Sequence, residues 1–309
     1  MDLHLLENII CIADERSITR AAEKRFVTQS ALNQQLQKLE EELGAALFIR
    51  SRNNWQLTDA GEVYLSAARK MILIKKDAYR QIADYTETGA RSLSVGLIPE
   101  RGVEMFTAVY PDFHKRYPNT RLEPVECNVT AMQRMISEGR LDLGLATLTQ
   151  EQQDSNAYIK LAEEEIILAV PADHPLSEGG KHDWRHSKIT NLIQFSEAPF
   201  VRIYRRSTLH GLTESLFQHA GFQPKELFST SSNLSKLRMV SLGLCCALLP
   251  AVYAEPLNSV VYFRLPGYPS WQITMCSRKG SVIGQTERFY IDLCRQYWEK
   301  RENYPRKGE

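Results

Sequence analysis

The sequence has little of what marks secreted, membrane-spanning or disulfide-stabilised proteins. It begins MDLHLLENII, without the basic segment, apolar core and small-residue cleavage site of a secretory signal. Its longest apolar run, near LGLCCALLPAVYA, contains a proline and falls short of the roughly 20 residues that a membrane span needs. The six cysteines show no CxxC spacing, so neither a disulfide framework nor a zinc site is indicated. We therefore expect a cytoplasmic protein with reduced thiols and no membrane partner.

Motifs of enzyme chemistry are also missing. The sequence contains no GxGxxG, P-loop, GxSxG or HExxH pattern. His182 and His186, with Asp183 between them, have a metal-like spacing, but no cysteine or third histidine lies nearby in the sequence. We expect a solvated loop there, and we predict no enzyme activity, no metal and no cofactor.

The charge balance gives no argument for a nucleic-acid partner. The chain of 309 residues carries 38 Lys and Arg against 37 Asp and Glu, and its amino-terminal segment is no more basic than the whole. Any such argument must therefore rest on where the charges lie. The length suits two or three domains.

A helix-turn-helix is predicted at about residues 18–37. Ser17 and Thr28 are favourable N-caps for two helices that a short break separates. The second helix repeats leucine at steps of four, three and four, at Leu32, Leu36, Leu39 and Leu43. Its other face is rich in amide side chains, and Gln and Asn can bond an adenine edge with two hydrogen bonds.

We expect this polar face to enter the major groove of DNA. A pair of short strands follows, with a turn at Asn53-Asn54. Arg50 and Arg52 in this pair are placed to contact phosphates. The alternative is a solvated face on a small helical bundle. The predicted DNA-binding residues are Arg20, Thr28, Gln29, Ser30, Asn33, Gln34, Lys38, Arg50 and Arg52.

A long helix is predicted after the helix-turn-helix unit of residues 1–58. From Thr58 to Tyr85, apolar residues recur mostly at alternating steps of four and three, and nothing breaks the helix before Gly89. A helix of roughly 40 Å with so narrow an apolar stripe needs a partner. We expect residues 59–89 to pair with the same helix of a second chain; the alternative is a helix lying on its own domain.

The remainder, residues 91–309, is predicted to be an α/β domain of two lobes. Short apolar runs alternate with helices in the order β-α-β-α-β, which indicates a parallel sheet with helices on its faces. A second, similar set follows. We expect lobe I to hold residues of about 91–161 and 266–300, with the last strand and helix returning to it, and lobe II residues of about 162–265.

The chain resembles the LysR-type transcriptional regulators. The segment from Glu15 to Leu65 is similar to their winged helix-turn-helix, over Ser17–Ala22, Gln29–Leu32, Leu39–Leu43, Leu47–Phe48, Arg50 and Leu57–Gly61. Further landmarks are GRLDLGLA (139–146), ADHPL (172–176), AGFQP (220–224) and GLCCALLP (243–250). The resemblance implies a two-lobed effector domain of the periplasmic-binding-protein type. It also implies a small-molecule co-inducer and a homotetramer, a dimer of dimers.

Two departures from the family pattern lie on the predicted reading face. Asn33-Gln34 stand where the family often has Ser-Arg, and Ser30 stands where it often has Pro. The operator sequence therefore does not carry over from the family. The DNA-binding units of two paired chains nevertheless suit a pseudo-palindromic operator of double-stranded DNA. RNA polymerase is a further candidate partner.

A ligand in an open α/β sheet lies beyond the carboxyl ends of the strands, near helix N-termini that favour anions. Pro99-Glu100 replace the Ser or Thr that the family often has after the first strand. Arg202 and Arg205-Arg206 could hold a carboxylate or phosphate, but for Arg205 and Arg206 a basic surface loop is the favoured interpretation. The effector is therefore expected to be a small molecule, with anions the first candidates. The predicted effector-binding residues are Ile98, Pro99, Glu100, Arg101, Asn128, Val129, Thr130, Ala146, Arg202, Ile203 and Tyr204.

The leading hypothesis is a ligand-responsive, DNA-binding transcriptional regulator. One alternative is a solute-binding protein of a transport system, against which residues 1–90 and the missing signal peptide argue. Another is a redox-sensing regulator that uses a cysteine, with Cys127 near the expected pocket. A small-molecule enzyme of α/β type is disfavoured by the missing catalytic motifs.

Overall fold

The computed structural model describes residues 2–51, 54–86 and 91–302. Contacts divide the chain into two compact units, Met1–Gly89 and Ala90–Glu309. Among the described residues, no helix is both long and apolar enough to cross a membrane.

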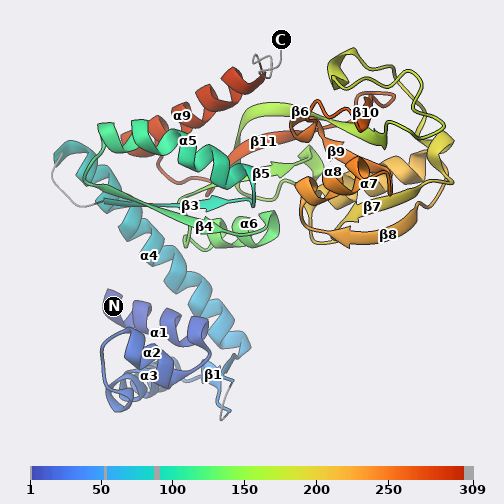
Figure 1. Ribbon diagram of the computed structural model, residues 1–309. Helices are drawn as coiled ribbons and strands as arrows, with labels where there is room; N and C mark the ends of the chain where they lie inside the picture. The colour runs from blue at the N-terminus through green and yellow to red at the C-terminus, as the bar shows by residue number, and fades with distance from the viewer. Residues whose placement is uncertain (1, 52–53, 87–90, 303–309) are drawn as a thin grey trace. The chain divides into compact units, whose positions relative to one another are not determined.

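The amino-terminal unit packs short helices beside a small β-hairpin (Figure 1). Helix α1 spans Leu3–Glu15, α2 spans Ile18–Lys24 and α3 spans Gln29–Leu43. Strands β1 (Phe48–Ile49) and β2 (Gln56–Leu57) pair antiparallel and form the wing. The predicted winged helix-turn-helix is therefore confirmed as a fold.

The predicted helix caps are confirmed in this unit. Ser17 Oγ accepts a hydrogen bond of 3.4 Å from the N–H of Arg20, and Thr28 Oγ1 accepts one of 3.2 Å from Ala31. Gly44, with a φ of 65°, ends α3 in the left-handed conformation that glycine adopts without strain. The leucine stripe is buried except at its last member, because Leu43 lies in the final turn and is 46% exposed.

Helix α4, Asp59–Thr86, is the predicted long helix, about 42 Å at 1.5 Å per residue. Its first half belongs to the core of the amino-terminal unit, since Leu65 and Ala68 are buried. Gly61 is required at this approach, because an added Cβ would lie 2.1 Å from the carbonyl oxygen of Leu47. The second half exposes large apolar side chains, including Ile74 at 68% and Ile82 at 57%.

The carboxy-terminal unit is built on a mixed sheet with strand order β10-β6-β11-β5-β3-β4, and β9 also pairs with β6. The β-α-β-α-β prediction is confirmed, because β3 pairs in parallel with β4 and β5. Strand β11 then joins antiparallel to both β5 and β6. The strands are β3 (Arg91–Leu97), β4 (Thr120–Glu126), β5 (Leu143–Leu148), β6 (Ala157–Pro171), β9 (Ala247–Pro250), β10 (Val260–Phe263) and β11 (Ser270–Ser277).

Two lobes share the long strand β6. Its first part pairs with β11 in lobe I, and its last residues pair with β9 and β10 in lobe II, as Figure 1 shows. Lobe II also holds a parallel pair of strands, β7 and β8. The further elements are α5 (Arg101–Arg116), α6 (Val129–Ser137), η1 (Gln150–Gln152), η2 (Trp184–His186), η3 (Leu192–Phe195), β7 (Pro199–Ile203), α7 (Thr208–His219), β8 (Lys225–Thr230), α8 (Asn233–Ser241), η4 (Ala251–Tyr253) and α9 (Gln285–Glu302).

The last strand and helix, β11 and α9, pack in lobe I. Helix α9 lies beside α5 and contributes Tyr290, Cys294 and Trp298 to the lobe I core. Lobe II has cores of its own on the two sides of its sheet. Each lobe is thus a separately packed body, and β6 and β11 connect them.

Candidate functional site

The outward face of α3 carries the amide and hydroxyl side chains that the sequence analysis singled out. Gln29, Ser30, Gln34 and Lys38 are exposed, and Asn33 is half-buried. The buried leucines occupy the opposite side of the helix and make its core contacts, so the polar face is not needed for packing. Thr28, also exposed, caps α3 and lies 3.2 Å from Ser30, Oγ1 to Oγ.

Among the predicted DNA-binding residues, the two arginines that the structure describes have partners within the unit. Arg20 donates to the carbonyl oxygen of Glu15. Arg50 lies 2.5 Å from the carboxylate of Glu40, Nη2 to Oε2, and its guanidinium lies 5.4 Å from the ring centre of Trp55. Arg52 falls outside the described residues.

A polar network links the four helices of the amino-terminal unit, and sequence reasoning missed it. Asn8, only 6% exposed on α1, donates to Gln35 of α3 over 2.8 Å and accepts from Arg25 over 2.9 Å. Arg25 also pairs with Glu7 at 2.7 Å, and Lys75 of α4 lies 3.6 Å from the same carboxylate. Burial opposes the charge of Glu7, but Arg25 lowers the pKa of this carboxyl below its usual value. The only sequence signal was a polar residue, Asn8, on the apolar side of the first helix.

A cavity of about 290 Å³ lies between the two lobes, at the carboxyl ends of strands β3 and β5. This volume is near the lower end of the range for small-molecule pockets. Its lining is Ile98, Pro99, Glu100, Arg101, Asn128, Val129, Thr147, Ile203, Tyr204, Arg206, Ser207, Thr208, Ser231, Asn233, Tyr253 and Trp271.

Most of the predicted effector-binding residues are in that wall, but three described residues lie elsewhere. Ala146 is fully buried in the sheet, and Thr147 faces the cavity instead because successive strand residues point to opposite faces. Arg202 differs from Ile203 for the same reason, and it pairs with Glu214 rather than facing the cavity. The third, Thr130, lies exposed on the first turn of α6.

The sequence analysis did not identify six wall residues from lobe II and from the returning strand, namely Ser207, Thr208, Ser231, Asn233, Tyr253 and Trp271. Ser207, which caps α7, carries a readable N-cap signal. Tyr253 and Trp271 lie more than 100 residues after the first strand of the wall, and only tertiary pairing brings them there.

Hydrogen bonds join the lobes at the cavity, among them the following two. Glu100 Oε1 of lobe I accepts from Ser232 Oγ of lobe II over 2.7 Å. Thr208 Oγ1 of lobe II donates to the carbonyl oxygen of Thr147 in lobe I, also over 2.7 Å. A ligand that changes either bond would change how the lobes are held together.

A buried ion pair joins Arg101 of the cavity wall to Glu164, which lies outside that wall. Arg101 and Glu164 are 4% and 7% exposed, and their side chains make two parallel hydrogen bonds, one of 2.8 Å. Glu164 also accepts from the indole of Trp271 over 2.8 Å and from the N–H of Val252 over 3.0 Å. Burial disfavours the guanidinium charge, yet Glu164 raises the pKa of Arg101 above its usual value. Burial raises the pKa of the neighbouring Tyr253 to about 12.

Lys236, on α8, is 1% exposed and lies behind the cavity wall. Its Nζ donates to the carbonyl oxygen of Leu248 over 2.5 Å and to Asn233 Oδ1 over 3.3 Å. Burial lowers the pKa of Lys236 to about 7, against an opposing effect of Glu100.

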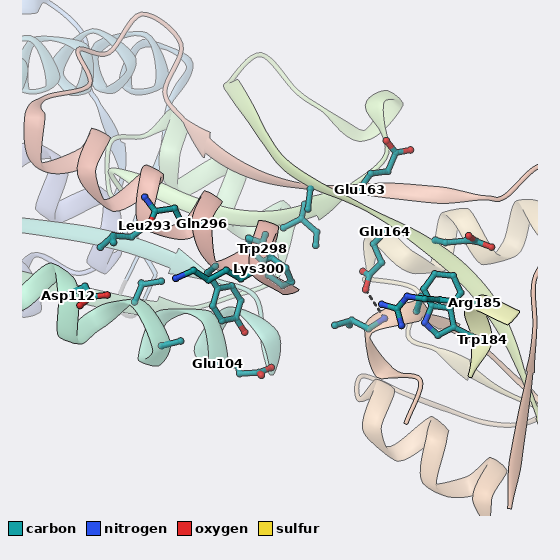
Figure 2. Close-up of a pocket in the computed structure, with 18 residues that line it drawn as sticks. Glu104, Asp112, Glu163, Glu164, Trp184, Arg185, Leu293, Gln296, Trp298 and Lys300 are labelled. Carbon is teal, nitrogen blue, oxygen red and sulfur yellow. Dashed lines mark hydrogen bonds between the residues drawn. The ribbon is translucent and has the colours of Figure 1, made fainter. Parts of the chain in front are cut away.

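A second, larger cavity of about 760 Å³ lies on the side of α5 and α9 (Figure 2). Figure 2 shows Trp184 and Arg185 across from Leu293 and Gln296 of α9. The carboxylates of β6 in its wall are already engaged, Glu164 by Arg101 and its neighbours by Lys160 and Arg264. It holds none of the predicted effector-binding residues, whereas the smaller cavity between the lobes holds most of them.

Metal and thiol chemistry find little support in the described residues. No group of three or more His, Cys, Asp or Glu side chains there is placed to hold a metal ion. His186 pairs with Asp183 at 2.8 Å, whereas His182 contacts the carbonyl oxygen of Val260. Burial raises the pKa of the Cys127 thiol, which disfavours its reactive thiolate form.

A helix-turn-helix with a polar outer face, followed along the chain by a two-lobed unit with a cavity, defines a ligand-responsive DNA-binding regulator. Residues 3–62 match the family described as bacterial regulatory helix-turn-helix protein, lysR family, and residues 86–299 match the LysR substrate binding domain. The chain belongs to the LysR family of transcriptional regulators.

The chain is similar in sequence to named transcriptional regulators over nearly its full length. The chain is 28% identical to the Hca operon transcriptional activator HcaR of Escherichia coli K12, over 91% of this chain and 93% of that protein. It is 26% identical to the DNA-binding transcriptional dual regulator OxyR of the same strain, over 92% and 91%. Among solved structures, a full-length OxyR variant of Pseudomonas aeruginosa shares the fold, with a TM-score of 0.70, 22% identity and coverage of 96% and 94%.

Proposed function

We propose that this regulator reads its operator through the outward face of α3 and senses a small molecule in the cavity between the lobes. The observation that carries the proposal is the separation of roles on α3. Leu32, Leu36 and Leu39 are buried, while amide side chains occupy the outward face. Residues 1–58 would form the DNA-binding domain, 59–89 the linker helix and 91–309 the effector domain.

Within the DNA-binding domain, we assign base reading to the amides and phosphate binding to the cations. Gln29, Asn33 and Gln34 can each bond an adenine edge, and Thr28 and Ser30 lie at the helix N-terminus, where a phosphate is favoured. The proposed phosphate ligands are Arg20, Lys38, Arg50 and Arg52.

The ion pair of Arg50 with Glu40 bears on its role. Arg50 is exposed and has five N–H donors, so it can keep Glu40 and still reach a phosphate. Its stacking on Trp55 restricts the side chain and so lowers the entropic cost of that contact.

A DNA-binding assay tests this proposal. Fluorescence anisotropy measures, at two salt concentrations, the binding of the full-length protein to the DNA upstream of its own gene. Arg50→Ala should weaken binding to specific and random DNA alike and reduce the salt slope by about 1. Lys70→Ala, which removes an exposed cation from α4, is the matched control and should change little. Removal of residues 1–58 should abolish binding; its survival would refute the assignment of the DNA-binding domain.

We propose that α4 pairs with α4 of a second copy. Ile74 and Ile82 expose large apolar surfaces on the second half of the helix, and such a stripe is stable when another helix covers it. A dimer would place two α3 helices on the half-sites of a pseudo-palindromic operator, and a dimer of dimers would extend the contact. Ile74→Lys with Ile82→Lys should lower the oligomeric mass measured by light scattering.

The remaining assignments follow from the regulator proposal. A protein that binds operator DNA and contacts RNA polymerase acts in the cytoplasm, and its chemistry is binding rather than catalysis. A cysteine-based redox sensor is less well supported, because burial raises the pKa of Cys245 to about 11 and that of Cys246, Cys276 and Cys294 to about 12. Thiols of this kind react slowly with peroxide.

A further inference from the structure

The cavity between the lobes contains a carboxylate of its own, that of Glu100. This residue lies between β3 and α5, with a φ of 61° and a ψ of −89°. A residue with a Cβ rarely adopts a positive φ, and such strain persists where the surroundings fix it, often at binding sites. The Glu100 side chain reaches Ser232 of lobe II, so its negative charge is held in the cavity wall.

An opposite charge lies in the lobe II part of the same wall. Arg206 is exposed, lines the cavity and directly precedes the N-cap of α7. The other wall arginine, Arg101, is matched by Glu164. The buried Lys236 directs its ammonium at a backbone carbonyl, and Glu100 is near enough to favour its charged form. Glu100 keeps further acceptor capacity beyond its bonds to Ser232 and Tyr253. Glu100 and Arg206 are therefore the charges that the wall presents to a ligand.

Apolar side chains cover much of the remaining wall. Ile98 and Val129 come from lobe I, Ile203 from lobe II, and Trp271 from the strand that connects them. A ligand that fills the 290 Å³ therefore needs a compact apolar body beside its charged groups.

We propose that the effector is a small amino acid zwitterion with an apolar side chain, its ammonium paired with Glu100 and its carboxylate with Arg206. The inference rests on the proposed effector-sensing role of this cavity and adds the chemical class of the ligand. A plain carboxylate would meet the like charge of Glu100, and a plain amine would leave Arg206 unmatched. The zwitterion satisfies both groups, and because they belong to different lobes it would link the lobes directly.

The experiment measures ligand affinity of the full-length protein by calorimetry. The probes are the common L-amino acids, together with analogues of leucine and phenylalanine that lack either the carboxylate or the amino group. The proposal expects at least one apolar amino acid to bind at least about tenfold more tightly than both of its analogues. Tighter binding of a plain carboxylate or a plain amine, or no binding by any amino acid, overturns it.

Two charge-neutralising variants test the assigned partners. Glu100→Gln should weaken the zwitterion about tenfold or more and leave the deaminated acid no weaker. Arg206→Gln should weaken the zwitterion and the acid but not the amine. Arg205→Gln is the matched control, because the neighbouring arginine is exposed and lies in the wall of a different pocket. Unchanged zwitterion affinity in both test variants overturns the proposal.

Operator binding, measured on the same preparations, separates this inference from the proposed function. If the amino acids do not bind as expected but the protein still binds its operator, the amino acid class is rejected and the regulator assignment is kept. Failure of the wild-type protein to bind its operator rejects the regulator assignment, whatever the ligand result. The melting temperature of each variant without ligand confirms that it folds.

Discussion

Removing the carboxylate of Glu164 is the perturbation whose cost the structure defines best. Glu164 and Arg101 are both almost fully buried, so Glu164→Ala would leave a guanidinium in the interior without its counter-charge. Breaking a buried pair in this way costs about 3–5 kcal/mol. The indole of Trp271 and the N–H of Val252 would lose their acceptor as well, which places the expected loss toward the upper end.

Thermal unfolding of the full-length protein measures this cost. For a unit of this size, 3–5 kcal/mol corresponds to a fall in melting temperature of roughly 6–20 °C. Glu163→Ala is the matched control: this neighbouring glutamate pairs with Lys160 at an exposed site, where an ion pair contributes about 0–1 kcal/mol.

A double variant completes the test. Replacing Arg101 and Glu164 together by methionine removes both charges and keeps apolar volume, so it should be more stable than Glu164→Ala. If Glu164→Ala costs less than about 1 kcal/mol, or if the double variant is no more stable than the single one, the pair is not the buried contact described above.

The other predictions concern positions where one contact decides the outcome. Gly61→Ala should destabilise the amino-terminal unit by about 1–3 kcal/mol in urea denaturation, because its Cβ would meet the carbonyl oxygen of Leu47; a neutral result would contradict the close approach. Since the pKa of Lys236 is lowered to about 7 on folding, the folded state binds fewer protons above that pH than the unfolded state, and stability rises with pH. The unfolding free energy of the wild type relative to Lys236→Met should therefore increase by about 2 kcal/mol from pH 7 to pH 9, and a flat difference would contradict the buried ammonium. Arg202→Ala should leave the ligand affinity measured by calorimetry unchanged, because this guanidinium pairs with Glu214 outside the cavity. A large loss of affinity would show that Arg202 belongs to the effector site.

Local signals in the sequence were enough for the helices of the amino-terminal unit. The leucine spacing of α3 and the caps Ser17 and Thr28 act within a few residues, so they could be interpreted without the fold. The polar network around Asn8 could not, because its partners lie on separate helices that only packing brings together.

The cavity shows where sequence reasoning reaches its limit on strands. The predicted segments at the carboxyl ends of β3 and β5 lie at the cavity, but of the pair Ala146-Thr147 the predicted site residues included only Ala146, whereas Thr147 faces the cavity. A shift of one residue along a strand reverses the face, and the sequence of a strand buried on both sides carries no alternation that would reveal it. Arg202 and Ile203 differ in the same way. Trp271 depends on the return of β11 to the sheet, and Tyr253 on the pairing of β9 with β6.

The central claim, that the outward face of α3 reads the operator, is tested most directly by Asn33→Ala. The measurement compares the affinity of wild type and variant for the DNA upstream of the gene and for a scrambled sequence, at one salt concentration. If Asn33 contacts a base, the variant should lose about 1–3 kcal/mol on the operator and change little on scrambled DNA, so that the specificity ratio falls. An equal loss on both DNAs would contradict base reading by this face of the helix.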